Sequence, residues 1–314
     1  MHKNQCPRPA PRSQAHDSCV YFWFVPGDGS TWEFGPHKLL CDRPVLVGVL
    51  NVTPDSFSDG GRFLDTSRAI EQGLKLARDG ADIIDIGGES TRPGSEPVST
   101  QLELDRIMPV IEGLRESGLE TPISVDTRKV PVAAEAVESG ATIVNDVSAL
   151  RDDPDLAAFC AEKGVGIVLM HMLGTPLTMQ RSPHYQDVIL EIGAFFEERL
   201  GFAISGGIPI ERIVLDPGIG FGKLLEHNLR ILRECGSWLG FGRPIMVGPS
   251  RKRFIGEVLD VDVGDRLAGT IGACVAALSS GARLFRVHDV GPVRQALLVA
   301  HSILSGLVPT PGHV

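Results

Sequence analysis

The sequence predicts a single (β/α)8 TIM barrel, and three observations point to that fold class. From residue 45 onward, short aliphatic runs alternate with amphipathic stretches, the pattern of parallel strands joined by helices. Eight such units follow one another over about 260 residues, a length typical of a closed barrel. No Gly-x-Gly-x-x-Gly motif follows the first run, which disfavours an open dinucleotide-binding sheet.

The expected strands are short and almost wholly apolar, as strands covered on both faces should be. They lie at residues 45–50, 83–87, 123–126, 142–146, 166–170, 213–216, 244–248 and 284–287. Helices are expected between them, the first at about 67–79, ending before a glycine. The second helix is indicated by apolar residues at three- and four-residue spacing, namely Leu104, Ile107, Ile111 and Leu114.

The two ends of the chain differ in composition from the barrel. Residues 1–18 carry prolines and basic side chains but few apolar ones, so we expect a disordered tail there. Residues 19–40 are expected to form a short N-terminal β-hairpin-like extension that caps the bottom of the barrel. The barrel is expected at 41–308 and a second tail at 309–314. The apolar run at 19–25 is short for a signal peptide and no small-residue cleavage site follows it.

The composition excludes several classes of partner. The net charge of −9 and the lack of any Lys/Arg cluster argue against a nucleic-acid binder. No apolar run reaches 18 residues, so we expect no membrane association. The six cysteines are scattered, without metal-like spacing, which is typical of reduced thiols in a cytoplasmic protein.

Polar residues stand at the C-terminal ends of the expected strands, where barrel enzymes carry their chemistry. These residues are Asn51, Arg92, Asp126, Asn145, His171, Asp216, Lys252, Arg286 and His288. A single one could merely cap the next helix, but capping does not explain a polar residue after every strand. A structural role explains His171 equally well, so we leave it out of the catalytic set.

The chemistry of this set indicates two kinds of ligand. Donors and acceptors suited to a flat nitrogen heterocycle come from Asp126, Asn145, Asp216 and Lys252. Positive charge for a phosphate comes from Arg92, Arg286 and His288. The residues therefore predict a heterocycle and a phosphate in the barrel mouth, and they do not name the reaction.

Eight motifs carry a resemblance to a known family. They are NVTPDSFSDGG at 51–61, DIGGESTRPG at 85–94, SVDT at 124–127, NDVS at 145–148, LMHM at 169–172, LDPGIGFGK at 215–223, SRK at 250–252 and RVHDV at 286–290. In this order and spacing they resemble the signatures of the dihydropteroate synthases, over roughly residues 43–305. Two positions depart from the family pattern. Pro249 stands where a flexible apolar residue is often found, and Arg128 stands where a serine is frequent.

The resemblance implies a transferase of folate synthesis. It would condense 6-hydroxymethyl-7,8-dihydropterin pyrophosphate with p-aminobenzoate by an SN1-like displacement, giving 7,8-dihydropteroate and pyrophosphate. Mg²⁺ is the implied cofactor, a homodimer the implied assembly, and sulfonamides the inhibitors that the family implies. Apart from a second copy of the chain, the expected partners are these small-molecule substrates, with no nucleic acid and no membrane.

The resemblance also implies a role for each site residue. The pterin would contact Asp126, Asn145, Asp216, Lys252 and Arg286. The pyrophosphate would contact Asn51, Arg92 and His288, with Asn51 also holding Mg²⁺ and Asp59 helping to organise the metal. The p-aminobenzoate would contact Phe57, Thr91, Pro93 and Ser250. The implied catalytic residues are Asp126, Lys252, Arg286, His288 and Asp59.

Two other functions compete with this one. A methyltetrahydrofolate-dependent methyltransferase could use a similar Asp–Asn–Asp pterin site, but it would not need the pyrophosphate-binding residues. A non-catalytic pterin-binding paralogue would keep the fold and lose the reaction. Intact Asn51, Arg92, Lys252 and His288 argue against this second alternative.

Overall fold

The structure is a computed structural model that describes residues 31–53 and 61–307. Its strands are β1 Thr31–Phe34, β2 His37–Leu40, β3 Val45–Asn51, β4 Ile83–Gly87, β5 Ile123–Asp126, β6 Ile143–Asp146, β7 Gly166–Met170, β8 Ile213–Asp216, β9 Met246–Val247 and β10 Leu284–Val287. Its α-helices are α1 Gly61–Arg78, α2 Thr100–Glu116, α3 Val130–Glu138, α4 Leu156–Lys163, α5 Val188–Ser205, α6 Leu225–Glu234, α7 Arg253–Leu259, α8 Leu267–Ser279 and α9 Val290–Ser305. Short 3-10 helices lie at Ile210–Arg212, Cys235–Phe241 and Val263–Asp265.

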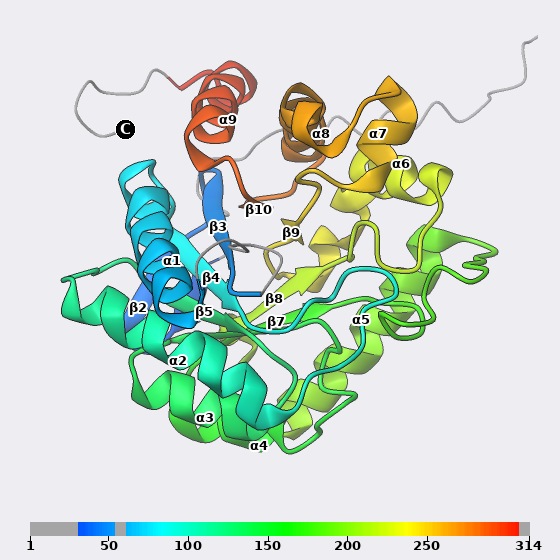
Figure 1. The fold of residues 1–314 in the computed structure, drawn as a ribbon. Helices are drawn as coiled ribbons and strands as arrows, with labels where there is room; N and C mark the ends of the chain where they lie inside the picture. The colour runs from blue at the N-terminus through cyan, green and yellow to red at the C-terminus, as the bar shows by residue number, and fades with distance from the viewer. Residues whose placement is uncertain (1–30, 54–60, 308–314) are drawn as a thin grey trace, which may run out of the picture.

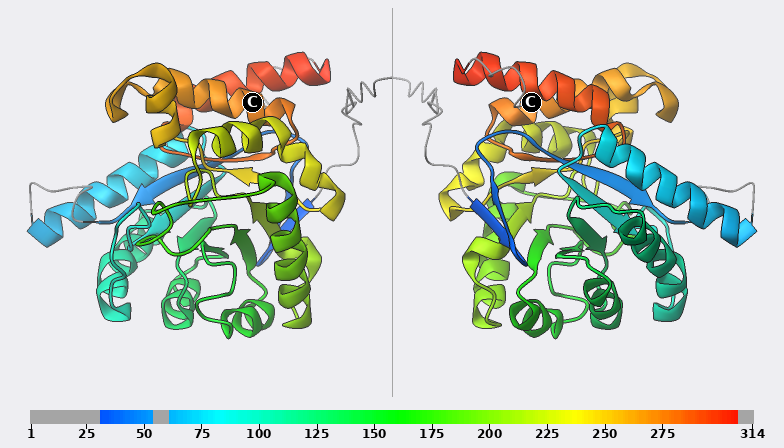
Figure 2. Two further views of the ribbon diagram at one scale, coloured as in Figure 1. Left: turned by 90° about the vertical axis from the view of Figure 1, so that its right-hand side faces the viewer. Right: turned by 90° about the vertical axis from the view of Figure 1, so that its left-hand side faces the viewer.

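Eight parallel strands form the barrel, in the order β8-β7-β6-β5-β4-β3-β10-β9. A single parallel bridge between Leu215 and Ile245 brings the two outer strands of that order together. The helices form a ring outside the strands (Figures 1 and 2). The predicted (β/α)8 fold is therefore confirmed.

Both faces of the barrel strands are covered, which explains why their sequences are nearly continuous apolar runs. One cluster of buried side chains packs between the strands and the surrounding helices. A second cluster lies inside the barrel and contains Val45, Val47, Ile83, Ile143, Val168, Val214, Met246 and Leu284. Side chains that point into the barrel and side chains that point toward the helices are therefore both apolar. The exceptions lie at the strand ends that form the site.

The β1–β2 hairpin closes one end of the barrel. Its strands pair antiparallel, and the Trp32 and Phe34 side chains, each 1% exposed, pack into the interior cluster. The Trp32 indole donates a hydrogen bond to the carbonyl of Arg212, and the Gly35 amide donates one to the carbonyl of Gly164. The expected capping strands are thus present at 31–40. Residues 19–30 lie outside the described residues, as do both expected tails.

Two elements differ from the sequence-based expectation by more than one residue at an end. The strand expected at 244–248 shortens to β9, because Pro244 has no amide hydrogen to donate and Ile245 forms only an isolated bridge. The first helix begins at Gly61 instead of about 67, and ends at Arg78. Neither change moves a strand end that carries a site residue. No helix in the described parts of the chain has the length and apolarity needed to cross a membrane.

Candidate active site

A buried ionic cluster at the C-terminal ends of four strands forms the centre of the site. Arg286 on β10 donates from Nε to Oδ2 of Asp85 on β4 over 2.6 Å, and from Nη2 to Oδ2 of Asp126 on β5 over 2.9 Å. The Asn145 amide on β6 donates to the same oxygen of Asp85 over 3.1 Å. Asp85 is fully buried and Asp126 is 8% exposed. One guanidinium therefore pairs with two buried carboxylates.

The pKa of each member follows from this arrangement. The pKa of Asp126 is raised to about 7, because burial, helped by the charges of Asp85, Glu103 and Glu89, outweighs the opposing charge of Arg286. Burial lowers the pKa of Arg286, but the Asp85 and Asp126 carboxylates outweigh burial and leave it raised. Arg286 therefore stays charged, and Asp126 gains or loses a proton near neutral pH.

Asp216 and Lys252 form a second part of the site. Asp216 at the end of β8 accepts a hydrogen bond from the Gly218 amide over 2.7 Å, and burial raises its pKa to about 6. The Lys252 ammonium lies 4.1 Å from the centre of the Phe221 ring. Burial, followed by the charge of Arg286, lowers the pKa of Lys252 to about 8. Both groups can therefore change protonation state close to physiological pH.

The turn after β8 must contain glycine to leave room for Lys252. A Cβ at Gly220 would lie 3.1 Å from Cδ of Lys252, and the residue has φ +81°. A side chain there would meet both a backbone penalty and a close contact. Gly220, in the motif at 215–223, thus leaves the space through which the Lys252 side chain passes the turn.

Ser250 and His288 form a third pair. The Ser250 hydroxyl lies 3.0 Å from Nδ1 of His288 and accepts a hydrogen bond from the His288 amide over 3.2 Å. Burial, followed by the charges of Arg286 and Arg251, lowers the pKa of His288 to about 4. The imidazole is therefore neutral at pH 7 and can meet a phosphate as a hydrogen-bond donor. A phosphate bound beside the ring would raise this pKa again, toward the positive charge that the sequence suggested for His288.

The remaining predicted residues are spread around the mouth. Asn51 ends β3 and is half-buried. Thr91, Arg92 and Pro93 lie on the loop after β4, where Thr91 is half-buried and the other two are exposed. The charge of Arg92 contributes to lowering the pKa of Lys252, which places Arg92 close enough to influence the mouth. Phe57 and Asp59 lie outside the described residues.

His171 belongs to a separate buried cluster. Its Nδ1 lies 3.0 Å from Nζ of Lys223, and its ring packs edge-on against Phe195. Lys223 also donates to the carbonyl of Phe221 over 3.0 Å. Burial lowers the pKa of Lys223 to about 7. The pair ties the end of β7 to the loop after β8, beside the part of the site formed by Asp216.

The structure adds residues that the sequence interpretation did not include. Asp85 is the central acceptor of the ionic cluster, and its signal was a lone carboxylate inside an otherwise apolar strand. Phe221 supports Lys252. Arg251 has φ +57° and is held by an ion pair to Asp289 and a hydrogen bond to Thr270, which fixes the backbone between Ser250 and Lys252. No local pattern indicated these last contacts.

Comparison with known proteins places the chain in a family. A family model described as pterin binding enzyme matches residues 47–288. A dihydropteroate synthase of Synechocystis is 45% identical over 262 residues, covering 83% of this chain and 90% of that protein. A dihydropteroate synthase of Escherichia coli is 44% identical over 263 residues, covering 84% of this chain and 93% of that protein.

Solved structures give the same result. A dihydropteroate synthase of Xanthomonas albilineans with 4-aminobenzoic acid has a TM-score of 0.83 and 42% identity, covering 90% of this chain and 100% of that one. The same enzyme in complex with 7,8-dihydropteroate has a TM-score of 0.79 and 40% identity, covering 89% of this chain and 100% of that one. The chain therefore belongs to the family of pterin-binding enzymes and stands among its dihydropteroate synthases.

Proposed function

We propose that this barrel is a dihydropteroate synthase, which joins 6-hydroxymethyl-7,8-dihydropterin pyrophosphate to p-aminobenzoate and releases pyrophosphate. The observation that carries the proposal is the buried cluster of Asp85, Asp126, Asn145 and Arg286, with Asp216 and Lys252 in the same barrel mouth. Fixed donors and acceptors of this kind suit a flat ring with amide and amino edges. The relatives are named as dihydropteroate synthases, and one was solved with the product.

The pterin would occupy the space between the two carboxylate groups of the mouth. Asp126, Asn145 and Asp216 would hydrogen-bond to the ring edges, and Lys252 would donate to a ring acceptor. Arg286 would lie against the ring face while staying paired with Asp85 and Asp126. Because Asp85 already holds the guanidinium, little reorganisation would be needed when the ring binds.

The pyrophosphate would bind at Asn51, Arg92 and His288. Within the described residues, no group of three or more His, Cys, Asp or Glu side chains could hold a metal ion. The donor set nonetheless suits Mg²⁺, which usually binds through one or two protein oxygens together with substrate phosphates. Asn51 would supply an amide oxygen, and we propose Asp59 as a second ligand. The ion would neutralise charge on the phosphates.

The p-aminobenzoate would bind at the outer rim, against Phe57, Thr91, Pro93 and Ser250. The reaction would start with cleavage of the bond between the exocyclic carbon and the pyrophosphate oxygen, whose electron pair leaves with pyrophosphate. Arg92 and His288 would stabilise that anion, and the Asp126 carboxylate would stabilise the carbocation. The neutral amine then forms the new C–N bond and loses a proton. Lys252 would hold the ring throughout.

A coupled assay for pyrophosphate release tests the proposed function. The full chain is incubated with the dihydropterin pyrophosphate and Mg²⁺, with and without p-aminobenzoate. We expect release that depends on the arylamine, together with a dihydropteroate product identified by mass spectrometry. Tight pterin binding without release would instead support the non-catalytic paralogue. Methyl transfer from methyltetrahydrofolate would support the methyltransferase.

Activity should depend on pH through Asp126 and Lys252. The Asp126 pKa of about 7 means that its carboxylate is lost as the pH falls, so kcat/KM for the pterin should decrease on the acid side of about pH 7. The Lys252 pKa of about 8 means that its ammonium is lost as the pH rises, giving a second decrease above about pH 8. Asp126→Asn should cut turnover at least about 100-fold and move the acid limb down toward about pH 6, the pKa of the remaining Asp216 carboxyl. An unchanged acid limb in that variant would remove Asp126 from this role.

A homodimer is the assembly that we propose. Helices α7, α8 and α9 lie side by side (Figure 1). Their outer surface exposes several apolar side chains, including Val258, Leu259, Val299 and Ile303. A second copy of the chain would cover this surface. Sedimentation equilibrium should give twice the chain mass, and Val258→Asp should lower it toward one chain. A wild-type mass of one chain would contradict the proposal.

The compartment that we propose is the cytoplasm. The described cysteines Cys41, Cys160, Cys235 and Cys274 are free thiols and all buried. Burial raises the pKa of each, to about 12 for Cys41 and Cys274 and to about 11 for Cys235. Such thiols are unreactive and need no disulfide partner, which fits a reducing environment.

A further inference from the structure

The loop between β4 and α2, residues 88–99, carries the groups that would meet the arylamine and the pyrophosphate, yet it contains no helix or strand. It crosses the barrel mouth toward the loop after β7 (Figure 1). Hydrogen bonds to its backbone hold it at three places. Arg106 donates to the Gly88 carbonyl over 2.7 Å at its start, and Lys129 donates to the Val98 carbonyl over 2.8 Å near its end. The Gly94 amide donates to the Pro176 carbonyl over 2.9 Å at its tip.

Glu89 connects this loop to the strand end beside it. Its carboxylate is 7% exposed, and each oxygen binds a different cation. Oε1 pairs with Arg128, and Oε2 pairs with Lys129 over 2.7 Å. Lys129 also pairs with Glu103 of α2 over 2.6 Å, and Glu103 is 1% exposed. Both ends of the loop therefore depend on cations that follow β5.

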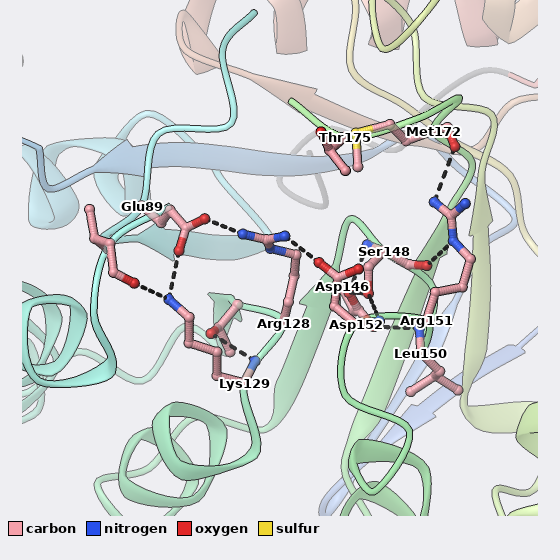
Figure 3. Close-up of polar contacts among 12 residues, drawn as sticks. Glu89, Arg128, Lys129, Asp146, Ser148, Leu150, Arg151, Asp152, Met172 and Thr175 are labelled. Atoms are coloured by element: carbon pink, nitrogen blue, oxygen red, sulfur yellow. Dashed lines mark hydrogen bonds and ion pairs between the residues drawn. The ribbon is translucent and has the colours of Figure 1, made fainter. Parts of the chain in front are cut away.

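Arg128 extends the connection to a third strand end. Its second terminal nitrogen pairs with Asp152 on the loop between β6 and α4 (Figure 3). The amide of Asp152 donates to the Ser148 hydroxyl, and that hydroxyl donates to the buried Asp146. Asp146 also accepts from the Leu150 amide, which stabilises a turn where Leu150 has φ +65°. Arg128 is thus held by the loop between β6 and α4, whose own conformation is stabilised by these hydrogen bonds.

These ion pairs are largely buried and contain more carboxylates than cations, so losing one cation should cost more than breaking an ion pair on the surface. Within the described residues, the ion pairs of Glu89, Glu103 and Asp152 are made with two cations, Arg128 and Lys129. The Arg128 side chain is 14% exposed, so its interactions are less screened by water than those of an exposed pair. Without Arg128, Glu89 and the buried Glu103 would share Lys129 alone. The loop would then lose the ion pair between Glu89 and Arg128, and the charge of the Glu89 carboxylate would be only partly compensated.

We propose that Glu89, Arg128 and Lys129 form a clamp that positions the loop at 88–99, and through it Thr91 and Arg92, for the arylamine and the departing pyrophosphate. These are positioning residues, since they would act through the loop and do not touch the substrates. Ordering the loop in advance would lower the entropic cost of binding the second substrate. The inference rests on the proposed function.

The test compares Arg128→Ser and Glu89→Gln with the wild type. Arg230→Ser is the matched control, because Arg230 also pairs with two carboxylates, Asp187 and Glu234, but lies on α6 away from the loop. We expect KM for p-aminobenzoate to rise roughly fivefold in Arg128→Ser and roughly 20-fold in Glu89→Gln. The affinity for 6-hydroxymethylpterin, which has no pyrophosphate for Arg92 to bind, should stay unchanged. Arg128→Lys should restore only part of the effect, because the guanidinium reaches Glu89 and Asp152 with two separate terminal nitrogens, and lysine offers a single nitrogen. The double variant should be no worse than Glu89→Gln alone.

Hydrogen exchange supplies a measurement that needs no catalysis. The amides of Gly94 and Ser95 should exchange faster in both clamp variants and at the wild-type rate in the control. Unchanged exchange, or KM values equal to those of the wild type, would overturn the clamp. A wild type that releases no pyrophosphate would overturn the proposed function instead, while the exchange data would still report on the clamp.

Discussion

The structure depends on placing two carboxylates, Asp85 and Asp126, in the barrel interior with a single guanidinium between them. Buried charges are costly unless they are paired, and Arg286 makes both pairs. The pairing joins β10 to β4 and β5 across the barrel axis. Because the partners come from strands that are far apart in the sequence, the ionic cluster forms only when the barrel does. The ligand-binding geometry is therefore a property of the complete fold.

The rest of the barrel keeps the ionic cluster buried. The β1–β2 hairpin and the apolar side chains near it close the opposite end, so that Trp32 and Phe34 occupy space that water would otherwise enter. A drier interior raises the pKa of Asp126 and Asp216 and lowers that of Lys252. Charged and polar groups that the fold holds in place can stabilise developing charge with little reorganisation. The fold thus sets both the positions and the protonation states of the site.

Much of this arrangement could be predicted from the sequence because it is encoded locally. The apolar runs located every barrel strand to within a few residues, and the polar residues after them marked the mouth. The strand expected at 244–248 is longer than β9, because the length of β9 is limited by Pro244 and by pairing with distant strands. Asp85 was overlooked because its importance lies in a partner 201 positions away. The contact between Glu89 and Arg128 joins residues 39 positions apart and likewise has no local signature.

The affinity of the barrel for the pterin tests the central role of the ionic cluster most directly. Binding of 6-hydroxymethylpterin would be measured by calorimetry for the wild type, for Asp85→Asn and for Asp82→Asn. Asp82 is a matched control, because it lies just before the same strand and pairs with Arg43 on the other side of the barrel from the site. The account predicts that Asp85→Asn weakens binding at least about tenfold, since Arg286 loses one of its two fixed partners, while Asp82→Asn does not. Equal affinity in Asp85→Asn and the wild type would contradict it.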